Sequence, residues 1–241
     1  MKKMMVCYSN YSGEKSQFFN TYTEKNFNQY CEKNNIDFYL IKDQKNHTIN
    51  RHPTWMSWEI ISNLIDDCKL VDGDKVFSLD ADTCITKMNE NMTSDMSFGY
   101  AIDSCNTHCM GFYTLTINEW SRKFVKNVLN EQRYQDFKDT SIWSMWNDQA
   151  SVYSLFGIQR HSWTPFSLLL NNGWHSCVTE DTLYNIEDIN KNVQIFPTEW
   201  NVTHVAGENL NEFFINPTHK KDTVIRHFAG GQKWNEAYFK V

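Results

Sequence analysis

The sequence predicts an α/β fold with a mainly parallel β-sheet flanked by helices. Short apolar runs typical of buried strands alternate with longer segments whose apolar residues recur at helical spacing. At 241 residues, the chain can bury a substantial core. Hydrophobic residues make up 41% of it and aromatic residues 15%, which argues against intrinsic disorder. No repeat or linker-like stretch divides residues 1–241, so we expect one domain, whether or not it was excised from a longer chain.

The N-terminal segment is the first predicted strand–helix unit. Residues 4–8 form a short apolar run followed by a polar loop over residues 9–13, which is typical of a buried strand entering a turn. A helix is expected next, because aromatic residues recur at roughly helical spacing: Phe18, Phe19, Tyr22, Phe27 and Tyr30. Residues 37–41 are the second predicted strand.

The next unit covers residues 53–79. Pro53 suits the first turn of a helix. The helix would carry an apolar stripe on one side: Trp58, Ile61, Leu64, Ile65 and Cys68. Asp72-Gly73-Asp74 is predicted as a turn, and residues 75–79 as a third strand.

The second half continues the alternation. Residues 98–102 and 110–115 are predicted strands. Thr116 and Glu119 are expected to form a capping box, and the helix that they open has one apolar side: Ile117, Trp120, Phe124 and Val128. Residues 143–156 are predicted as a helix, and 193–196 and 224–228 as late strands. Because such βαβ units give a mainly parallel sheet, we expect ligands at the carboxyl ends of its strands.

The charge of the chain narrows the classes of partner. Lys and Arg total 23 and Asp and Glu total 29, which gives a formal net charge of −6. A duplex-binding surface needs a basic stripe, so we expect no nucleic-acid partner. An acidic chain does suit a protein that holds a divalent cation.

The N-terminal sequence, the lack of long apolar runs and the cysteine pattern indicate the cellular compartment of the protein. Met1-Lys2-Lys3 is not followed by a long apolar stretch, so no signal peptide is expected. No apolar run approaches the ~20 residues that a transmembrane helix needs. Seven cysteines without paired spacing argue against a disulfide framework. We therefore expect a soluble, cytoplasmic protein in a reducing compartment, with no transmembrane segment.

The strongest chemical signal is Asp80-Ala81-Asp82, just past the third predicted strand. In extended backbone residues i and i+2 point the same way, so both carboxylates can reach one hard cation. Mn²⁺ or Mg²⁺ prefers such ligands and commonly bridges to phosphate. The pattern alone is weak, because Asp72-Gly73-Asp74 also matches it in a predicted turn. Taken alone, Asp80 and Asp82 fit a surface loop or a helix cap as well as a metal site.

A second constellation lies near the end of the sequence. His227 closes an apolar run, Gly230 follows three residues on, and Lys233 three beyond that. His227 can complete a cation site, and glycine lets backbone N–H groups approach phosphate closely. Lys233 would neutralise a diphosphate. Without context, a core or surface histidine and a solvated lysine are the commoner interpretations.

A third piece is Asp148-Gln149, on the helix predicted over residues 143–156. An acid and an amide side by side can hydrogen-bond sugar hydroxyls. Without context, an exposed polar turn of helix is the commoner interpretation.

Together these pieces resemble the nucleotide-sugar glycosyltransferases of the GT-A fold, in particular glycosyltransferase family 8, the group of glycogenin and bacterial lipopolysaccharide galactosyltransferases. The family's Leu-Asp-x-Asp is matched by residues 79–82 and its Asn-Asp-Gln by residues 147–149. Its aromatic–Asn step after a proline resembles Pro-Thr-Glu-Trp-Asn at residues 197–201. Its closing His-Phe-x-Gly-x-x-Lys-Pro-Trp is matched by residues 227–234 without the proline. Ala150 replaces an acid usual in the family, and residues 52–55 resemble family 34.

The resemblance implies a GT-A (Rossmann-like) single domain with a mixed sheet, and a role for each matching residue. Asp80 would contact the ribose and the metal, Asp82 would bind the metal, and His227 would be the third protein ligand of Mn²⁺ or Mg²⁺. The nucleotide-sugar pocket would be completed by Tyr8, Ser9, Asn10, Tyr11, Ala81, Gly230 and Lys233. In that pocket Tyr11 would stack on uracil, and Lys233 with the Gly230 backbone would hold the diphosphate.

The implied activity is transfer of a hexose from a UDP-sugar to a glycan or glycoconjugate acceptor with retention of anomeric configuration. Gln149 would lie nearest the anomeric carbon, and Asp148 would orient hydroxyls. Three alternatives stay open: an inverting transferase with Asp148 as general base, a non-catalytic carbohydrate-binding module that uses exposed aromatic rings, and a metal-dependent phosphohydrolase.

Overall fold

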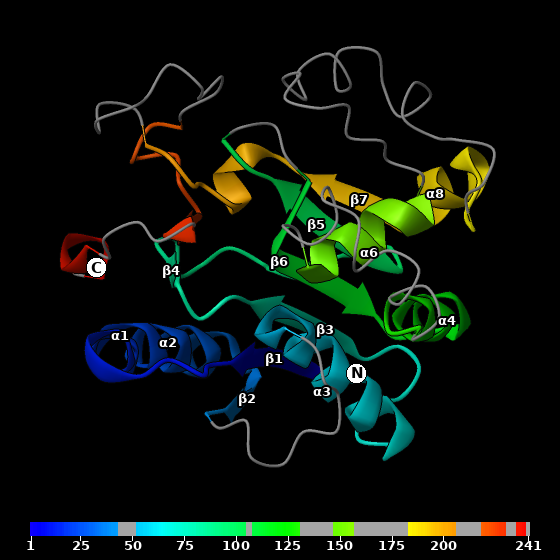
Figure 1. Cartoon of the computed structure of the whole chain (residues 1–241), viewed down its shortest axis with the longest axis horizontal. Helices are drawn as coiled ribbons and strands as arrows, with labels where there is room; N and C mark the ends of the chain where they lie inside the picture. Colours follow the sequence, from blue (N-terminus) through cyan, green and yellow to red (C-terminus); the bar gives the residue numbers. More distant parts are fainter. Residues whose placement is uncertain are drawn as a thin grey trace.

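The computed structural model describes residues 1–42, 52–104, 108–130, 147–156, 183–205, 218–229 and 235–239. Within them, one mixed sheet has the strand order β2-β1-β3-β6-β5-β7 (Figure 1). Its strands are β1 (Lys3–Tyr8), β2 (Asp37–Ile41), β3 (Lys75–Leu79), β5 (Phe98–Ile102), β6 (His108–Thr116) and β7 (Val193–Phe196). The pairs β1–β2, β1–β3 and β5–β7 are parallel, and β6 runs antiparallel to both β3 and β5. The predicted α/β fold with a mainly parallel mixed sheet is confirmed.

Helices cover both faces of this sheet, because side chains along a buried strand alternate between two apolar layers. Met4 and Val6 of β1 belong to one hydrophobic cluster, and Met5 and Cys7 to the other. The first cluster is closed by α3 (Met56–Asp66), α4 (Glu119–Val128), α6 (Asn147–Phe156) and α8 (Ile186–Asn192). The second is closed mainly by α2 (Glu24–Asn34), which follows α1 (Gly13–Phe18) and a π-helical turn over Phe19–Thr23.

A short two-stranded ribbon lies beyond the carboxyl edge of the sheet. It pairs β4 (Thr83–Ile85) with β8 (Ile225–His227) in antiparallel register, with Thr83 opposite His227. A strand was predicted at residues 224–228, but β4 was not, because its three residues are too few for a periodic pattern. The ribbon matters because its register places His227, near the end of the sequence, opposite Thr83, which closely follows β3.

Two local predictions were wrong. The helix start was assigned to Thr116 and Glu119, but Thr116 pairs with Lys75 as the last residue of β6. Asn118 is the N-cap: its side chain accepts from the backbone N–H of Ser121, and the Ser121 hydroxyl accepts from the N–H of Asn118, both at 2.9 Å. Asn118 and Ser121 therefore form the capping box at the start of α4.

Cys68 was the second error. It was placed on the apolar stripe of α3, but the helix ends at Asp66. Cys68 takes a left-handed conformation with φ 55° and its side chain is exposed. The other four residues predicted for that stripe are buried. The stripe therefore stops one turn earlier than its spacing suggested.

The carboxyl ends of β1 and β3 lie at one edge, because these strands are parallel neighbours. The loop after β1 and the turn before β4 therefore face each other, next to the ribbon.

Within the described residues, no helix combines the length and apolar composition that crossing a bilayer requires.

Candidate metal centre and adjoining pocket

Asp80 and Asp82 converge because the chain turns sharply after β3. The backbone N–H of Thr83 donates to the carbonyl oxygen of Asp80 at 3.1 Å, and the Thr83 hydroxyl donates to the same oxygen at 2.8 Å. Residues 80–83 thus form a tight turn held by two hydrogen bonds. The expected convergence is present, but its expected cause, an extended backbone, is wrong.

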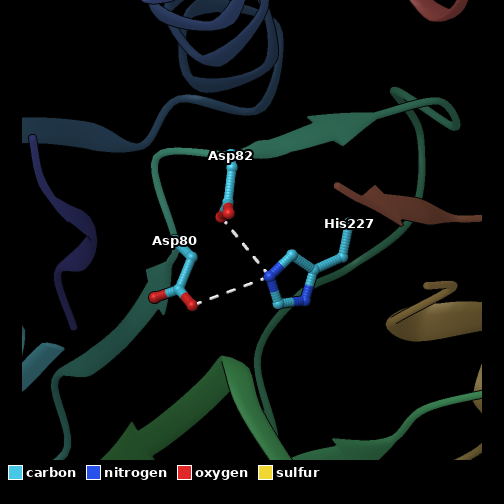
Figure 2. A group of neighbouring side chains, drawn as sticks. All are labelled: Asp80, Asp82 and His227. Atoms are coloured by element: carbon cyan, nitrogen blue, oxygen red, sulfur yellow. Dashed lines mark ion pairs between the residues drawn. The ribbon is translucent and has the colours of Figure 1, made fainter. Parts of the chain in front are cut away.

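His227 points its imidazole at both carboxylates (Figure 2). Its Nε2 lies 3.3 Å from Asp82 Oδ1 and 3.8 Å from Asp80 Oδ2. One ligand atom from each of the three residues lies within 4.8 Å of the others, the only such group of His, Cys, Asp or Glu found in the described part of the chain. Residues 145 positions apart in sequence (82 to 227) therefore share one site through the β4–β8 ribbon.

These three donors fit a divalent cation. Adjacent ligands of an octahedral ion with bonds of ~2.1 Å lie ~3.0 Å apart. The two separations from Nε2, 3.3 and 3.8 Å, are longer than this, so the side chains would move closer together to act as three of the ligands of an ion. Two carboxylate oxygens and one imidazole are ligands that suit Mn²⁺ and Mg²⁺.

The charges of the three groups depend on one another. Burial and then repulsion from Asp82 raise the pKa of Asp80 to about 7. Burial also acts to raise the pKa of Asp82, but the positive charge of His227 outweighs it and holds that pKa below its usual value. Burial lowers the pKa of His227, but the charge of Asp82 outweighs it and raises that pKa well above its usual value. A cation bound here would take over the role of these protons.

Three residues contact the His227 ring on the side away from the carboxylates: Asn201, Gly111 and Cys109, whose Sγ lies 4.0 Å from Nδ1. Nδ1 lies 2.8 Å from Oδ1 of the fully buried Asn201. Gly111 of β6 packs against the ring, and its carbonyl oxygen accepts from the backbone N–H of Asp80 at 3.0 Å. Gly111, within β6, therefore contacts both His227 and Asp80 of the candidate metal centre.

A pocket of about 490 Å³ opens beside the carboxylates. It lies between the loop after β1, the start of the α3 region and the turn after β3. Its described lining residues are Tyr8, Asn10, Tyr11, Ser12, Lys15, His52, Pro53, Thr54, Ser57, Leu79, Asp80, Ala81 and Asp82. Of the residues assigned to the nucleotide-sugar pocket, Tyr8, Asn10, Tyr11, Asp80 and Ala81 are thus brought together. Ser9 is buried, and its backbone N–H donates to the Ile41 carbonyl at 2.9 Å.

Tyr11 and Lys15 add polar groups to this pocket. Burial, followed by the charges of Asp82 and Asp80, raises the pKa of Tyr11, whose hydroxyl also hydrogen-bonds to Asp82. The Lys15 ammonium lies 5.5 Å from the centroid of the Tyr11 ring, and its charge acts on Asp82. The pocket therefore contains a lysine as well as carboxylates.

Asp148 is buried at the first turn of α6. Its Oδ2 accepts from the indole N–H of Trp58 at 3.0 Å, and its carboxylate also accepts from the hydroxyl of Thr54, which lines the pocket. Burial raises the pKa of Asp148 to about 6, against the opposing effect of the Trp58 hydrogen bond. The alternative interpretation, an exposed polar turn of helix, therefore does not hold for this residue.

Gln149 is also buried, and both ends of its amide are hydrogen-bonded. Its Oε1 accepts from the backbone N–H of Met110 at 3.1 Å, and its Nε2 donates to the Tyr153 hydroxyl at 3.0 Å. Helix α6 thus docks on β6 through a polar contact.

Gly230 and Lys233, which were also predicted to line the site, lie outside the described residues.

Only weak signals in the sequence point to the remaining site residues. Lys15 has the pattern of a surface lysine, although it follows the predicted loop by two residues. His52 and Thr54 belong to the segment that resembles family 34, but no role was assigned to them. Asn201 was noted only as part of a motif, and nothing in the sequence pairs it with His227.

No protein-family model and no curated protein sequence matches the chain. Among solved structures, it is similar to a glycosyltransferase involved in the glycosylation of the major capsid of PBCV-1, with a TM-score of 0.55 and 10% identity over 95% of each chain. The chain has the GT-A fold.

Two further glycosyltransferases of known structure are similar. The galactosyltransferase LgtC, in complex with donor and acceptor sugar analogs, has a TM-score of 0.46 and 12% identity over 95% of this chain and 88% of LgtC. GlyE of Streptococcus pneumoniae TIGR4 has a TM-score of 0.42 and 13% identity over 98% of this chain and 57% of GlyE. The GT-A assignment rests on the first comparison, whose score is above 0.5.

Proposed function

We propose that this chain is a metal-dependent glycosyltransferase that moves a hexose from a UDP-sugar to a glycan or glycoconjugate acceptor. The observation that carries the proposal is the convergence of Asp80, Asp82 and His227 beside a pocket of about 490 Å³. This pocket lies at the carboxyl ends of β1 and β3 in a GT-A fold, the edge at which open α/β sheets bind ligands.

The donor would occupy the pocket with its diphosphate toward the metal centre. Asp80, Asp82 and His227 would hold Mn²⁺ or Mg²⁺, which offsets the negative charge that develops on the departing nucleoside diphosphate. Lys15 would add a second positive charge, and Lys233 with the Gly230 backbone would be a third source of stabilisation. Ser9 and Asn10 would support the base side of the pocket, and the Tyr11 ring offers a flat apolar surface to uracil.

Asp148 and Gln149 would act at the sugar. Both are fixed by hydrogen bonds to other elements, which gives the precise placement that group transfer between two bound substrates needs. For a retaining reaction, we place Gln149 nearest the anomeric carbon and assign Asp148 to orienting hydroxyls. For an inverting reaction, Asp148 would be the general base, and its pKa of about 6 would leave it ionised at neutral pH.

A non-catalytic sugar-binding module is less well supported. Sugar-stacking platforms need exposed rings, but among the described residues Trp55 and Trp58 are buried, and Trp120 and Trp200 are partly buried against the two hydrophobic clusters. A phosphohydrolase would need more metal-directed acids than the single group found in the part of the chain that the structure describes.

A donor screen tests the proposal. Wild type is incubated with UDP-hexoses and Mn²⁺, with and without EDTA, and products are identified by mass spectrometry and NMR. We expect metal-dependent release of UDP and free or transferred hexose, at least 100-fold slower for Asp82→Ala. Asp72→Ala, in the other Asp-x-Asp sequence, is the matched control and should behave as wild type. Release of UMP and sugar phosphate would instead identify a phosphohydrolase, and equal activity of Asp82→Ala would refute the proposal.

A further inference from the structure

One ring nitrogen of His227 faces away from the carboxylates. Nδ1 lies 2.8 Å from Oδ1 of Asn201, while Nε2 lies on the opposite side of the ring, toward Asp80 and Asp82. An amide oxygen only accepts hydrogen bonds. The contact therefore requires a proton on Nδ1, for which Cys109 Sγ at 4.0 Å is a second, weaker acceptor. In the neutral ring, the lone pair of Nε2 is then left for a metal ion.

The amide of Asn201 keeps this orientation although it leaves a polar atom without a partner. The residue is fully buried, and its Nδ2 has no hydrogen-bond partner. The reversed amide would pair Nδ2 with Nδ1, but it would then require the ring proton on Nε2, in the position of a metal ion. A buried donor without a partner is unfavourable, so its presence calls for a reason. Presenting an acceptor to Nδ1 is such a reason.

The backbone around Asn201 holds the side chain in place. Its N–H donates to the Thr198 carbonyl at 3.0 Å, which closes the 3₁₀ turn over Thr198–Trp200. The next residue, Val202, is hydrogen-bonded to the β8 backbone on both sides: its N–H donates to Ile225 and its carbonyl accepts from His227, each at 2.9 Å. Asn201 and His227 are therefore fixed relative to each other by main-chain contacts.

We propose that Asn201 is a positioning residue for the metal centre: it fixes the Nδ1–H tautomer and the ring orientation of His227, so that Nε2 points at the cation. The assignment rests on the proposed metal-dependent function. Polar partners of this kind typically contribute 10- to 100-fold to metal affinity.

Three variants test the assignment. Asn201→Leu keeps the size of the side chain and removes the acceptor, whereas Asn201→Asp keeps an acceptor at the same place. Asn26→Leu is the matched control: Asn26 is also a buried asparagine beside the ribbon, but its amide pairs with the backbone of Ile85, at 2.9 Å in both directions. Mn²⁺ affinity is measured by electron paramagnetic resonance, and the tautomer of His227 by ¹⁵N NMR of the protein loaded with diamagnetic Mg²⁺.

We expect Asn201→Leu to bind Mn²⁺ 10- to 100-fold more weakly and to lose the Nδ1–H signature. Asn201→Asp should keep that signature, and its Mn²⁺ affinity should be no more than threefold weaker than that of wild type. Asn26→Leu should melt at a lower temperature and keep its Mn²⁺ affinity.

The outcomes separate the two proposals. Wild-type affinity and tautomer in folded Asn201→Leu would overturn the positioning role alone. If Asn201→Leu does not fold, a more than tenfold loss of Mn²⁺ affinity in Asn201→Asp, or an Nε2–H tautomer there, would overturn it instead. A wild-type protein that binds no Mn²⁺ would refute the proposed metal-dependent function.

Discussion

Gly111 packs directly against the imidazole of His227 in the candidate metal centre. A Cβ atom added to Gly111 would lie 2.4 Å from Cε1 and 2.6 Å from Nδ1 of the imidazole. Real Cβ atoms do not approach ring atoms so closely, so only glycine at this position of β6 lets His227 reach Asp80 and Asp82. The identity of a strand residue thus depends on a histidine more than a hundred positions later.

Gly111→Ala should therefore displace the ring of His227. We expect Mn²⁺ affinity to fall at least tenfold and the free energy of unfolding to fall by about 1–3 kcal/mol, as for other overpacking substitutions. Gly99→Ala is the control, because its Cβ would also overpack, at 2.8 Å from Phe196 and 2.9 Å from Thr114, but away from the metal centre. It should lose stability and keep Mn²⁺ affinity. If both variants bind Mn²⁺ as wild type does, the contact has no role in the site.

Lys15 should contribute to binding of the anionic donor. Its ammonium lies beside Tyr11 in the pocket and is exposed, so we expect a modest effect: Lys15→Ala should weaken UDP binding by about 0.5–1 kcal/mol, less at high salt. The exposed Lys69, which pairs with Asp67 outside the pocket, provides the control Lys69→Ala. Calorimetric titration with UDP distinguishes them; identical affinities for the two variants would remove Lys15 from the donor site.

Asp148 should make the protein less stable as the pH rises from about 4 to 6. Burial raises its pKa to about 6 in the folded protein, so in this window the folded state binds more protons than the unfolded state. Asn at this position can still accept from Trp58. The difference in free energy of unfolding between Asp148→Asn and wild type should therefore shift in favour of the variant by up to about 3 kcal/mol between pH 4 and 7.

Urea unfolding at several pH values measures this difference. Asp95→Asn is the control, because Asp95 is exposed and its hydrogen bond and ion pair with Lys75 lower its pKa. It should not reproduce the shift. Parallel stability curves for wild type and Asp148→Asn would show that Asp148 titrates normally.

The elements that depend on local composition could be predicted from the sequence. The strands over residues 37–41, 75–79, 98–102 and 193–196 match their observed bounds, because each is an apolar run bounded by polar residues or turns. The cap of α4 was assigned two residues too early, because Thr116 and Asn118 are both good capping residues and the pairing of Thr116 with Lys75 depends on tertiary structure.

The part of the site that could be predicted consists of residues whose type alone indicates metal chemistry. Asp80, Asp82 and His227 were singled out for their chemistry, and the structure brings them together. The roles of three other residues could not be predicted, because they depend on tertiary structure. The role of Asn201 depends on the register of the β4–β8 ribbon, that of Gly111 on the distance between β6 and the ribbon, and that of Lys15 on the direction of α1. The interpretation of residues 1–241 as one domain stays a prediction.

Metal-dependent donor binding is tested by calorimetric titration of UDP into the wild-type chain with saturating Mn²⁺ and, separately, with EDTA. We expect UDP to bind with Mn²⁺ present, to bind at least tenfold more weakly with EDTA, and to show the same loss in Asp82→Ala with Mn²⁺ present. Equal UDP affinity under all three conditions would contradict a metal centre formed by Asp80, Asp82 and His227.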